Sequence, residues 1–236
     1  MNVDALIDYV MNTPLSWIII TMSTYKIGII IYEKTGKHAL LQPIVIAYVL
    51  MLPILIIAQI PYKQYFESVS ILHFFLGPAT VALALPLYKN LQLIRAYFLP
   101  VMITLLAGGI FTILSALGIL WLFGASKITM LSMTTKSVTA PITLITAHDI
   151  GANAALAIGF VVITGLLGAL FGTFVFKLLK IKHDAAKGFA LGLISHAVGT
   201  ARAFEISENA AAFSALAMGL VGMFIAVFLP IVIGFL

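Results

Sequence analysis

The sequence predicts an all-α polytopic membrane protein with about seven or eight membrane elements, some of them broken or re-entrant. Of its 236 residues, 62% are hydrophobic and 9% are charged, whereas a soluble domain usually carries about a quarter charged residues. The mean hydropathy is +1.16. Apolar runs recur along the chain at close to the ~20 residues that a helix needs to cross a hydrocarbon core of ~30 Å. Together these observations leave a membrane protein as the class that fits.

The same composition excludes several other classes. An ordinary soluble enzyme, a disordered chain and a nucleic-acid-binding protein all need more charge than this chain has. The net charge of +5 does not indicate a surface that binds nucleic-acid phosphates, because the 13 Lys and Arg are scattered between apolar runs. The chain has no Cys, which excludes disulfides and thiolate ligands. HExxH, paired-carboxylate and P-loop patterns are also missing, so we expect no enzyme, no metal and no cofactor.

Five runs are expected to be full spans. The first contains a single charge at Lys26, the next carries none, and the third is kinked near Pro100. The fourth is rich in Gly and Ala, and the last is uncharged to its end. In chain order these runs are 14–32, 39–61, 96–125, 151–176 and 209–236. The first run is too long and too acidic at its flank for a signal peptide, so we expect it to be retained.

Three further elements are expected to be interrupted. Residues 70–88 are broken at Gly77-Pro78, and 128–147 are broken around Lys136 and Pro141. Residues 188–204 are short and polar. We treat 1–236 as one integral membrane domain, with scaffold spans in 1–68 and a broken-helix transport core in 69–236.

Loop charges predict the orientation, since Lys and Arg collect on the cytoplasmic side. The acidic N-terminus is expected outside. The basic loops contain Lys34 and Lys37, then Lys89 and Arg95, and finally Lys177, Lys180, Lys182 and Lys187. Simple alternation puts the last cluster on the wrong side, so one element must enter and leave on the same side. We favour 128–147, because irregular backbone at membrane depth must be buried in protein or line a cavity; 70–88 is the alternative.

A short interrupted element followed by a longer helix rich in small residues recurs from about 70, 128 and 188. One interpretation is an inverted repeat with broken helices, a common design of secondary transporters. The other is that Gly, Ala and Thr simply let membrane helices pack closely.

Lys136 is the centre of the first candidate site. Ionisable groups inside hydrocarbon cost roughly 2.5–3.5 kcal/mol on insertion scales and are functional candidates for that reason. Hydroxyls and free amide groups at a helix start can hold an anion, with the lysine adding a full charge. The alternative is a lysine that extends to the interface and marks only topology. The hydroxyl residues around it are Ser132, Thr134, Thr135, Ser137 and Thr139.

The second candidate site lies at 195–205. Arg202 could bind a carboxylate through two hydrogen bonds, and a proton could be coupled at His196 or Glu205. The alternative is a structural pair between Arg202 and Glu205, three residues apart on a helix, with His196 as a packing residue. The candidate substrate-binding residues of this segment are Ser195, His196, Gly199, Thr200 and Arg202.

These motifs, taken together, resemble the LrgB/CidB family from about Pro43 to Pro230. The matching stretches are Pro86-Leu87-Tyr88-Lys89, Lys136-Ser137-Val138-Thr139-Ala140-Pro141-Ile142, and Ser195-His196-Ala197-Val198-Gly199-Thr200-Ala201-Arg202 with Glu205 and Ala212-Phe213-Ser214. Gln42 before Pro43 departs from the Asn-Pro of many relatives, although Gln keeps the same donor and acceptor groups.

The resemblance implies a bacterial inner-membrane protein with an LrgA/CidA-like membrane partner, and it implies two functions. One is a carrier for small monocarboxylates such as pyruvate, glycolate or glycerate. The other is a holin/antiholin-like regulator of murein hydrolase export and cell lysis. A carrier would hold a carboxylate between the Lys136 segment and Arg202. A regulator would need the small-residue stripes of 151–172 and 209–222 as packing faces. A homodimer is compatible with either function.

Overall fold

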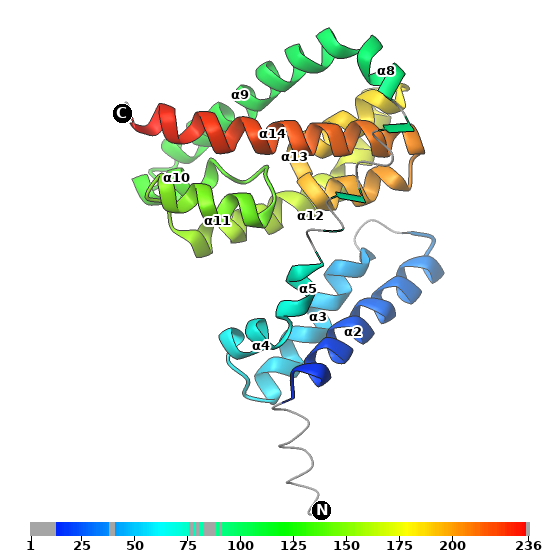
Figure 1. Ribbon diagram of the computed structural model, residues 1–236, viewed down its shortest axis with the longest axis vertical. Coiled ribbons are helices and arrows are strands. Elements are labelled where there is room, and N and C mark those ends of the chain that lie inside the picture. The colour runs from blue at the N-terminus through cyan, green and yellow to red at the C-terminus, as the bar shows by residue number, and fades with distance from the viewer. Residues whose placement is uncertain are drawn as a thin grey trace, which may run out of the picture. The chain divides into compact units, whose positions relative to one another are not determined.

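The computed structural model describes residues 13–37, 41–75, 78, 81–82, 88–89 and 91–234 (Figure 1). Within these ranges every regular element is a helix, which confirms the predicted all-α class. Four of the described helices are long and apolar enough to cross a membrane, and one bent pair would make five. The expected number of seven or eight elements is therefore not confirmed. The chain divides into two compact units, Met1–Ala82 and Leu83–Leu236.

The first unit contains α2 (Pro14–Lys34), α3 (Pro43–Ile57), α4 (Tyr62–Ser68) and α5 (Ser70–Phe74). Both α2 and α3 begin with a proline, which suits the first helical turn because no backbone N–H is needed there. The expected span 39–61 is shorter than predicted, because α3 stops at Ile57 and the chain bends by 117° into α4.

The interrupted element expected at 70–88 lies only partly within the described residues. Residues 76–77, 79–80 and 83–87 fall outside them, and with them Gly77 and the Pro86-Leu87 part of the family motif. The expectation that 70–88 is broken therefore stays a prediction.

The second unit carries the candidate sites. It contains a short helix, a long one, a pair of short ones and three further long helices. In order these are α8 (Leu91–Ala96), α9 (Phe98–Leu122), α10 (Lys127–Met133), α11 (Ala140–Asp149), α12 (Ala154–Leu178), α13 (Asp184–Phe204) and α14 (Glu208–Gly234). Pro100 is the third residue of α9, where the first turn accepts proline, so the helix is continuous where a kink was expected.

α10 and α11 form a hairpin with its tip at residues 134–139. Asn153, just before α12, donates its backbone N–H at 3.0 Å to Ser132, the last residue but one of α10, so the start of α12 lies beside the end of α10. At the tip, Lys136 reaches Thr112, near the middle of α9. The element expected at 128–147 is thus interrupted between α10 and α11, and its re-entrant placement in the membrane stays a prediction.

α13 is interrupted, as expected for 188–204, and it folds back as a second hairpin, which the sequence did not predict. Its backbone breaks at His196, where φ is 42° and ψ is −130°. Beyond the break, Gly199 lies so close to the first half that a Cβ there would be 2.3 Å from the Leu191 carbonyl oxygen. The chain therefore folds back on itself. Hydrogen bonds from Lys187 and Ser207 lower the pKa of the Asp184 carboxyl, which shows that the two ends of the hairpin meet.

The second hairpin packs between α12 and α14. Along α12, positions Gly172 and Gly168 face Leu191 and Ser195, so α13 begins antiparallel to α12 and reaches only about half its length. A Cβ at Gly192 would be 2.0 Å from the Ser214 carbonyl oxygen, so glycine is required for this approach to α14.

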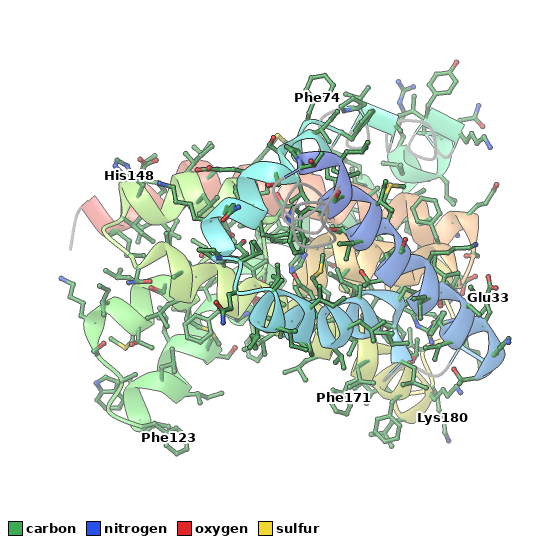
Figure 2. The ribbon with its side chains drawn as sticks, turned by 90° about the horizontal axis from the view of Figure 1, so that it is seen from below. Glu33, Phe74, Phe123, His148, Phe171 and Lys180 are labelled. Atoms are coloured by element: carbon green, nitrogen blue, oxygen red, sulfur yellow. The ribbon has the colours of Figure 1, made fainter. Side chains whose placement is uncertain are left out.

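The two hairpins enter the unit from opposite ends, as Figure 1 shows for α10–α11 and α13. We call the end with α8, the 179–183 loop and the 205–207 turn the basic end. It carries Lys89, Arg95, Lys177, Lys180, Lys182 and Lys187, and an ion pair of 3.9 Å joins Lys89 to Glu208. In Figure 2, Lys180 projects at this end, and Phe123 and His148 project at the other. Both basic loops of this unit thus share one end, as the charge argument requires.

This arrangement makes the segments from α10 and from α13 an inverted pair, each a hairpin followed by a long helix. The repeat expected from about 70, 128 and 188 had the first and third stretches as its inverted pair; the first lies only partly within the described residues, so that repeat stays a prediction. The small-residue stripes of α12 and α14 are partly used inside this pair, since Ala157, Ala169 and Ala210 have no exposed surface. Gly159 and Gly219 have open space beside them, so the stripes as partner-binding faces stay a prediction.

Candidate anion-binding site

Lys136 lies at the tip of the first hairpin, where the chain is neither α10 nor α11. Only 9% of its surface is exposed. Its Nζ donates hydrogen bonds to Thr112 Oγ1 at 3.4 Å and to Ser137 Oγ at 3.3 Å. Both partners are neutral hydroxyls, so the charge of this buried ammonium is not neutralised by these contacts.

Other cations of the second unit differ from Lys136 in this respect. Arg202 pairs with Glu205, Lys187 pairs with Asp184 at 2.8 Å, and Lys89 pairs with Glu208. No carboxylate of the described residues forms an ion pair with Lys136. A buried charge is normally paired, so this position favours a bound anion.

A cavity of about 380 Å³ adjoins Lys136; it is open on one side, where Phe111 and Ile119 are exposed. Lys136 is the one charged residue among those described as lining it, and the two hydroxyls belong to α9. The others are apolar, with Met133 from the first hairpin and Ile194 from the second. The lining residues are Phe111, Thr112, Ser115, Ala116, Ile119, Leu120, Met133, Lys136 and Ile194.

Most hydroxyls predicted to surround an anion instead hold the hairpin together. Thr134 and Thr135 donate to the carbonyls of Leu131 and Ser132 at 2.6 and 3.2 Å. These bonds satisfy backbone groups freed where the helix stops. Thr139 precedes α11 in extended conformation and makes no side-chain cap. Of the predicted group, Ser137 is the hydroxyl that contacts Lys136.

The Ser195–Thr200 segment forms the tip of the second hairpin. His196 is buried, and its Nε2 lies 3.0 Å from the Val161 carbonyl oxygen. Thr200 donates to the His196 carbonyl at 2.9 Å and contacts Ser214 Oγ at 3.0 Å. Ser195 Oγ is buried with no hydrogen-bond partner among the described residues. These contacts support the packing interpretation of His196, and a functional role for it stays a prediction.

Arg202 and Glu205 form the ion pair that their spacing predicted. They lie where α13 has returned toward the basic end, and Arg202 is not among the described residues that line the Lys136 cavity. Gly199 serves the close approach of the two halves of α13. The expectation of one carboxylate held between Lys136 and Arg202 therefore finds no support in the cavity, and the role of Arg202 stays a prediction.

Sequence reasoning missed Thr112 and Ser115, which bring the hydroxyls of α9 to the cavity. A signal for them exists, because α9 is otherwise apolar apart from Thr104 and the two residues are three apart. That spacing places them on one face of a helix. For metals, the described residues contain no group of three or more His, Cys, Asp or Glu that could hold an ion.

Comparison with known proteins assigns the chain to a family. The model of the LrgB-like family matches residues 21–235. The chain belongs to the LrgB-like family. A holin-like protein CidB of Staphylococcus epidermidis is 29% identical over 216 residues, covering 92% of this chain and 94% of the relative. An antiholin-like protein LrgB of Bacillus cereus is 28% identical over 224 residues, covering 95% and 97%. No solved structure matches.

Family and structure together make this a multi-pass membrane protein of the LrgB-like family. The residues that match the family model include the Lys136 segment and the Ser195–Glu205 segment, which carried the resemblance in the sequence.

Proposed function

We propose that this protein is a membrane carrier for small monocarboxylates of the pyruvate, glycolate and glycerate class. The observation that carries the proposal is the burial of Lys136 without a carboxylate partner, beside a cavity of about 380 Å³. An uncompensated cation in an apolar environment is costly. An arriving carboxylate would offset that cost and would gain a charge-assisted hydrogen bond.

The hairpins suggest how such a carrier would work. The tips at Lys136 and His196 come from opposite ends of the unit, and each reaches about the middle of a long helix. Substrate bound between the two tips would be separated from each aqueous side by one hairpin. Movement of either hairpin would then open the site to one side, as alternating access requires. Proton coupling through His196 or Glu205 belongs to the same proposal.

Uptake of radiolabelled pyruvate and glycolate into proteoliposomes tests the carrier. Lys136→Met removes the charge and keeps much of the apolar stem, and it should abolish saturable uptake. Lys127→Met is the matched control, because Lys127 is an exposed lysine of the neighbouring α10. Arg202→Ala should be measured beside them to decide whether the second site takes part. Uptake that survives in Lys136→Met would overturn the proposed site.

A second candidate is a holin/antiholin-like regulator of murein hydrolase export and cell lysis. The names of the relatives, holin-like CidB and antiholin-like LrgB, favour this candidate over the carrier. They also favour a membrane-protein partner of the LrgA/CidA kind. Such a role depends on contacts with that partner and does not need a buried lysine.

The two candidates separate in a strain whose lysis depends on this protein. Under the regulator hypothesis, Lys136→Met should leave lysis control intact while the protein still inserts. Loss of lysis control together with uptake would give the lysis phenotype a transport origin. Adding the LrgA-like partner to the liposomes tests whether the chain works alone. Replacing Gly165 or Gly168 by Leu is a poor test of partner binding, since both contact α13 in the same chain.

The proposed setting is the bacterial inner membrane, with the basic end in the cytoplasm and the N-terminus outside. The six Lys and Arg residues of the basic end support this orientation, because such residues are retained on the cytoplasmic side. A homodimer remains part of the proposal.

A further inference from the structure

The first unit contains a cavity that neither candidate function uses. Its volume is about 420 Å³, and its walls come from α2, α3, α4 and α5. Along α3 the lining extends from Ile44 to Leu55, a rise of about 16 Å at 1.5 Å per residue. That length is close to the depth of one leaflet, which is about half of a hydrocarbon core of ~30 Å. The lining residues are Thr21, Met22, Thr24, Tyr25, Ile44, Ala47, Tyr48, Met51, Leu52, Leu55, Tyr62, Tyr65 and Leu72.

The shape of this cavity suits a single hydrocarbon chain. A volume of about 420 Å³ over a length of about 16 Å gives a mean cross-section of about 26 Å². An α-helix with its side chains has a diameter of about 10–12 Å and therefore a cross-section of roughly 80–110 Å², so a partner helix does not fit inside. A lipid chain can enter from the bilayer, because four of the lining side chains are exposed: Met22, Tyr25, Tyr48 and Leu52.

Neutral hydroxyls supply the polar surface of the cavity, and no charged residue is among its described lining. Thr21 Oγ1 donates to the Trp17 carbonyl at 2.7 Å. Its one proton is used in this bond, so the hydroxyl of Tyr65, 3.0 Å away, donates to Thr21. Thr24 Oγ1 donates to the Thr21 carbonyl at 2.9 Å. Tyr65 and Thr24 therefore offer a ligand their lone pairs and no proton.

These two acceptors limit the head group of the lipid. A hydroxyl can donate to them, whereas a carboxylate or an ester can only accept. An ionised head group would also be buried here without a cation, at a high desolvation cost. The position of α4 fits a head group, because the chain bends by 117° between α3 and α4 and the tyrosines of α4 are of the kind found at the membrane interface.

We propose that this cavity binds a neutral lipid with a hydroxyl head group, of the acylglycerol class. One acyl chain lies along α3, and Tyr65 and Thr24 accept hydrogen bonds from the head-group hydroxyls. The cavity shares no lining residue with the Lys136 cavity. The proposal therefore stands independently of both functions proposed above.

Trp17 provides a direct signal for an occupied cavity. It has no exposed surface, packs with Met51 and Leu55, and its ring lies edge-on to that of Tyr65 with 6.0 Å between centroids. The chain has two tryptophans, so Trp121→Phe leaves Trp17 as the single indole fluorophore. Bromine atoms on an acyl chain quench tryptophan fluorescence at short range. The quenching of Trp17 in detergent micelles is measured with a monoacylglycerol, a fatty acid methyl ester and a phosphatidylglycerol that carry the same dibrominated chain.

We expect saturable quenching by the monoacylglycerol, with half-saturation about 3- to 10-fold below that of the methyl ester, the effect of one hydrogen bond. Phosphatidylglycerol should quench weakly and without saturation. Tyr65→Phe and Thr24→Val each remove one acceptor, and together they should abolish the preference for the monoacylglycerol over the methyl ester. Ser23→Val is the matched control, because Ser23 is an exposed residue of α2 outside the lining, and it should leave the preference unchanged.

A second variant fills the cavity. Ala47→Phe places a ring inside it and should abolish saturable quenching, whereas Val49→Phe adds a ring on the exposed surface of α3 and should not. Far-UV circular dichroism and the emission maximum of Trp17 without added lipid check that the variants are folded. Equal affinities for the three lipids, tighter binding of phosphatidylglycerol, or saturable quenching that survives in Ala47→Phe would each overturn the proposal.

Discussion

The break of α13 at His196 gives a sharp test of the fold. In a continuous helix, Gly is less stable than Ala by about 1 kcal/mol. At His196, however, φ is 42°, a conformation that costs a residue with a side chain roughly 1–3 kcal/mol and costs Gly little. Replacing His196 by Gly and by Ala removes the same imidazole and the same contact with Val161 in both variants. Their difference therefore reports the backbone alone.

We expect His196→Gly to be more stable than His196→Ala by about 1–2 kcal/mol, opposite in sign to the helix rule. For a chain of this size, 1 kcal/mol corresponds to about 2–4 °C in the melting temperature, so the Gly variant should melt about 2–8 °C higher. Thermal unfolding in detergent followed by far-UV circular dichroism measures this. Dyes that react with exposed thiols are not an option, because the chain has no Cys.

Ala107→Gly is the control for the ordinary rule. Ala107 is exposed in the interior of α9, so its replacement by Gly should lower the melting temperature. Equal melting temperatures for the two His196 variants, or a higher one for Ala, would mean that the helix continues through position 196. The hairpin, and the return of α13 to the basic end, would then be refuted.

Two further predictions concern topology and packing. Single cysteines that replace Lys180 and Ser207 should react with an impermeant maleimide added to one side of the membrane. A cysteine that replaces Ser126 should react only with maleimide added to the other side. Reaction of positions 207 and 126 from the same side would contradict the α13 hairpin. In thermal unfolding, Gly192→Ala should destabilise the protein by about 1–3 kcal/mol, because the new Cβ meets the Ser214 carbonyl oxygen. The control is Gly219→Ala, which has open space for its Cβ and should be neutral or stabilising by up to about 1 kcal/mol.

The spans of the fold were predictable where the sequence is long, apolar and uncharged. Runs at 14–32, 96–125, 151–176 and 209–236 correspond to α2, α9, α12 and α14. The parity of the basic loops required one element that enters and leaves on the same side; 128–147 was favoured for its irregular backbone over 70–88, and that choice stays a prediction. That argument used the loops at 89–95 and 177–187, which share one end of the second unit.

The interruption within 188–204 was expected, but the reversal of α13 into a hairpin was not, for a physical reason. The reversal occurs at one residue, His196, which has positive φ and contacts Val161 and Gly165 of α12. Such a tertiary constraint is not written in local propensity. A hint was present in the glycines at 188, 192 and 199, which are costly in a helix unless another backbone comes close.

The site was predictable at Lys136, since a charge in an apolar segment calls for explanation, but its surroundings were not. Hydroxyls next to it in sequence mostly bond to the backbone of the hairpin. The hydroxyl at the other end of the 3.4 Å contact is Thr112, 24 residues away. Hydroxyls next to a helix break bond to their own backbone, so the partners of a side chain at the tip come partly from another element.

The buried and unneutralised Lys136 bears on the choice between the two functions. A regulator that works by packing would be selected for tight helix contacts, and the glycines and alanines around α13 meet that need inside the chain. It would gain nothing from a buried ammonium that two hydroxyls leave unneutralised, which costs stability in any apolar site. A carrier needs such a group, because binding strong enough to remove an anion from water must come from a charge that is unsatisfied until the anion arrives. If a Lys136→Met protein keeps lysis control and is more stable than wild type, the lysine serves transport and not regulation. If the variant instead loses both activities while its stability is unchanged, regulation depends on transport.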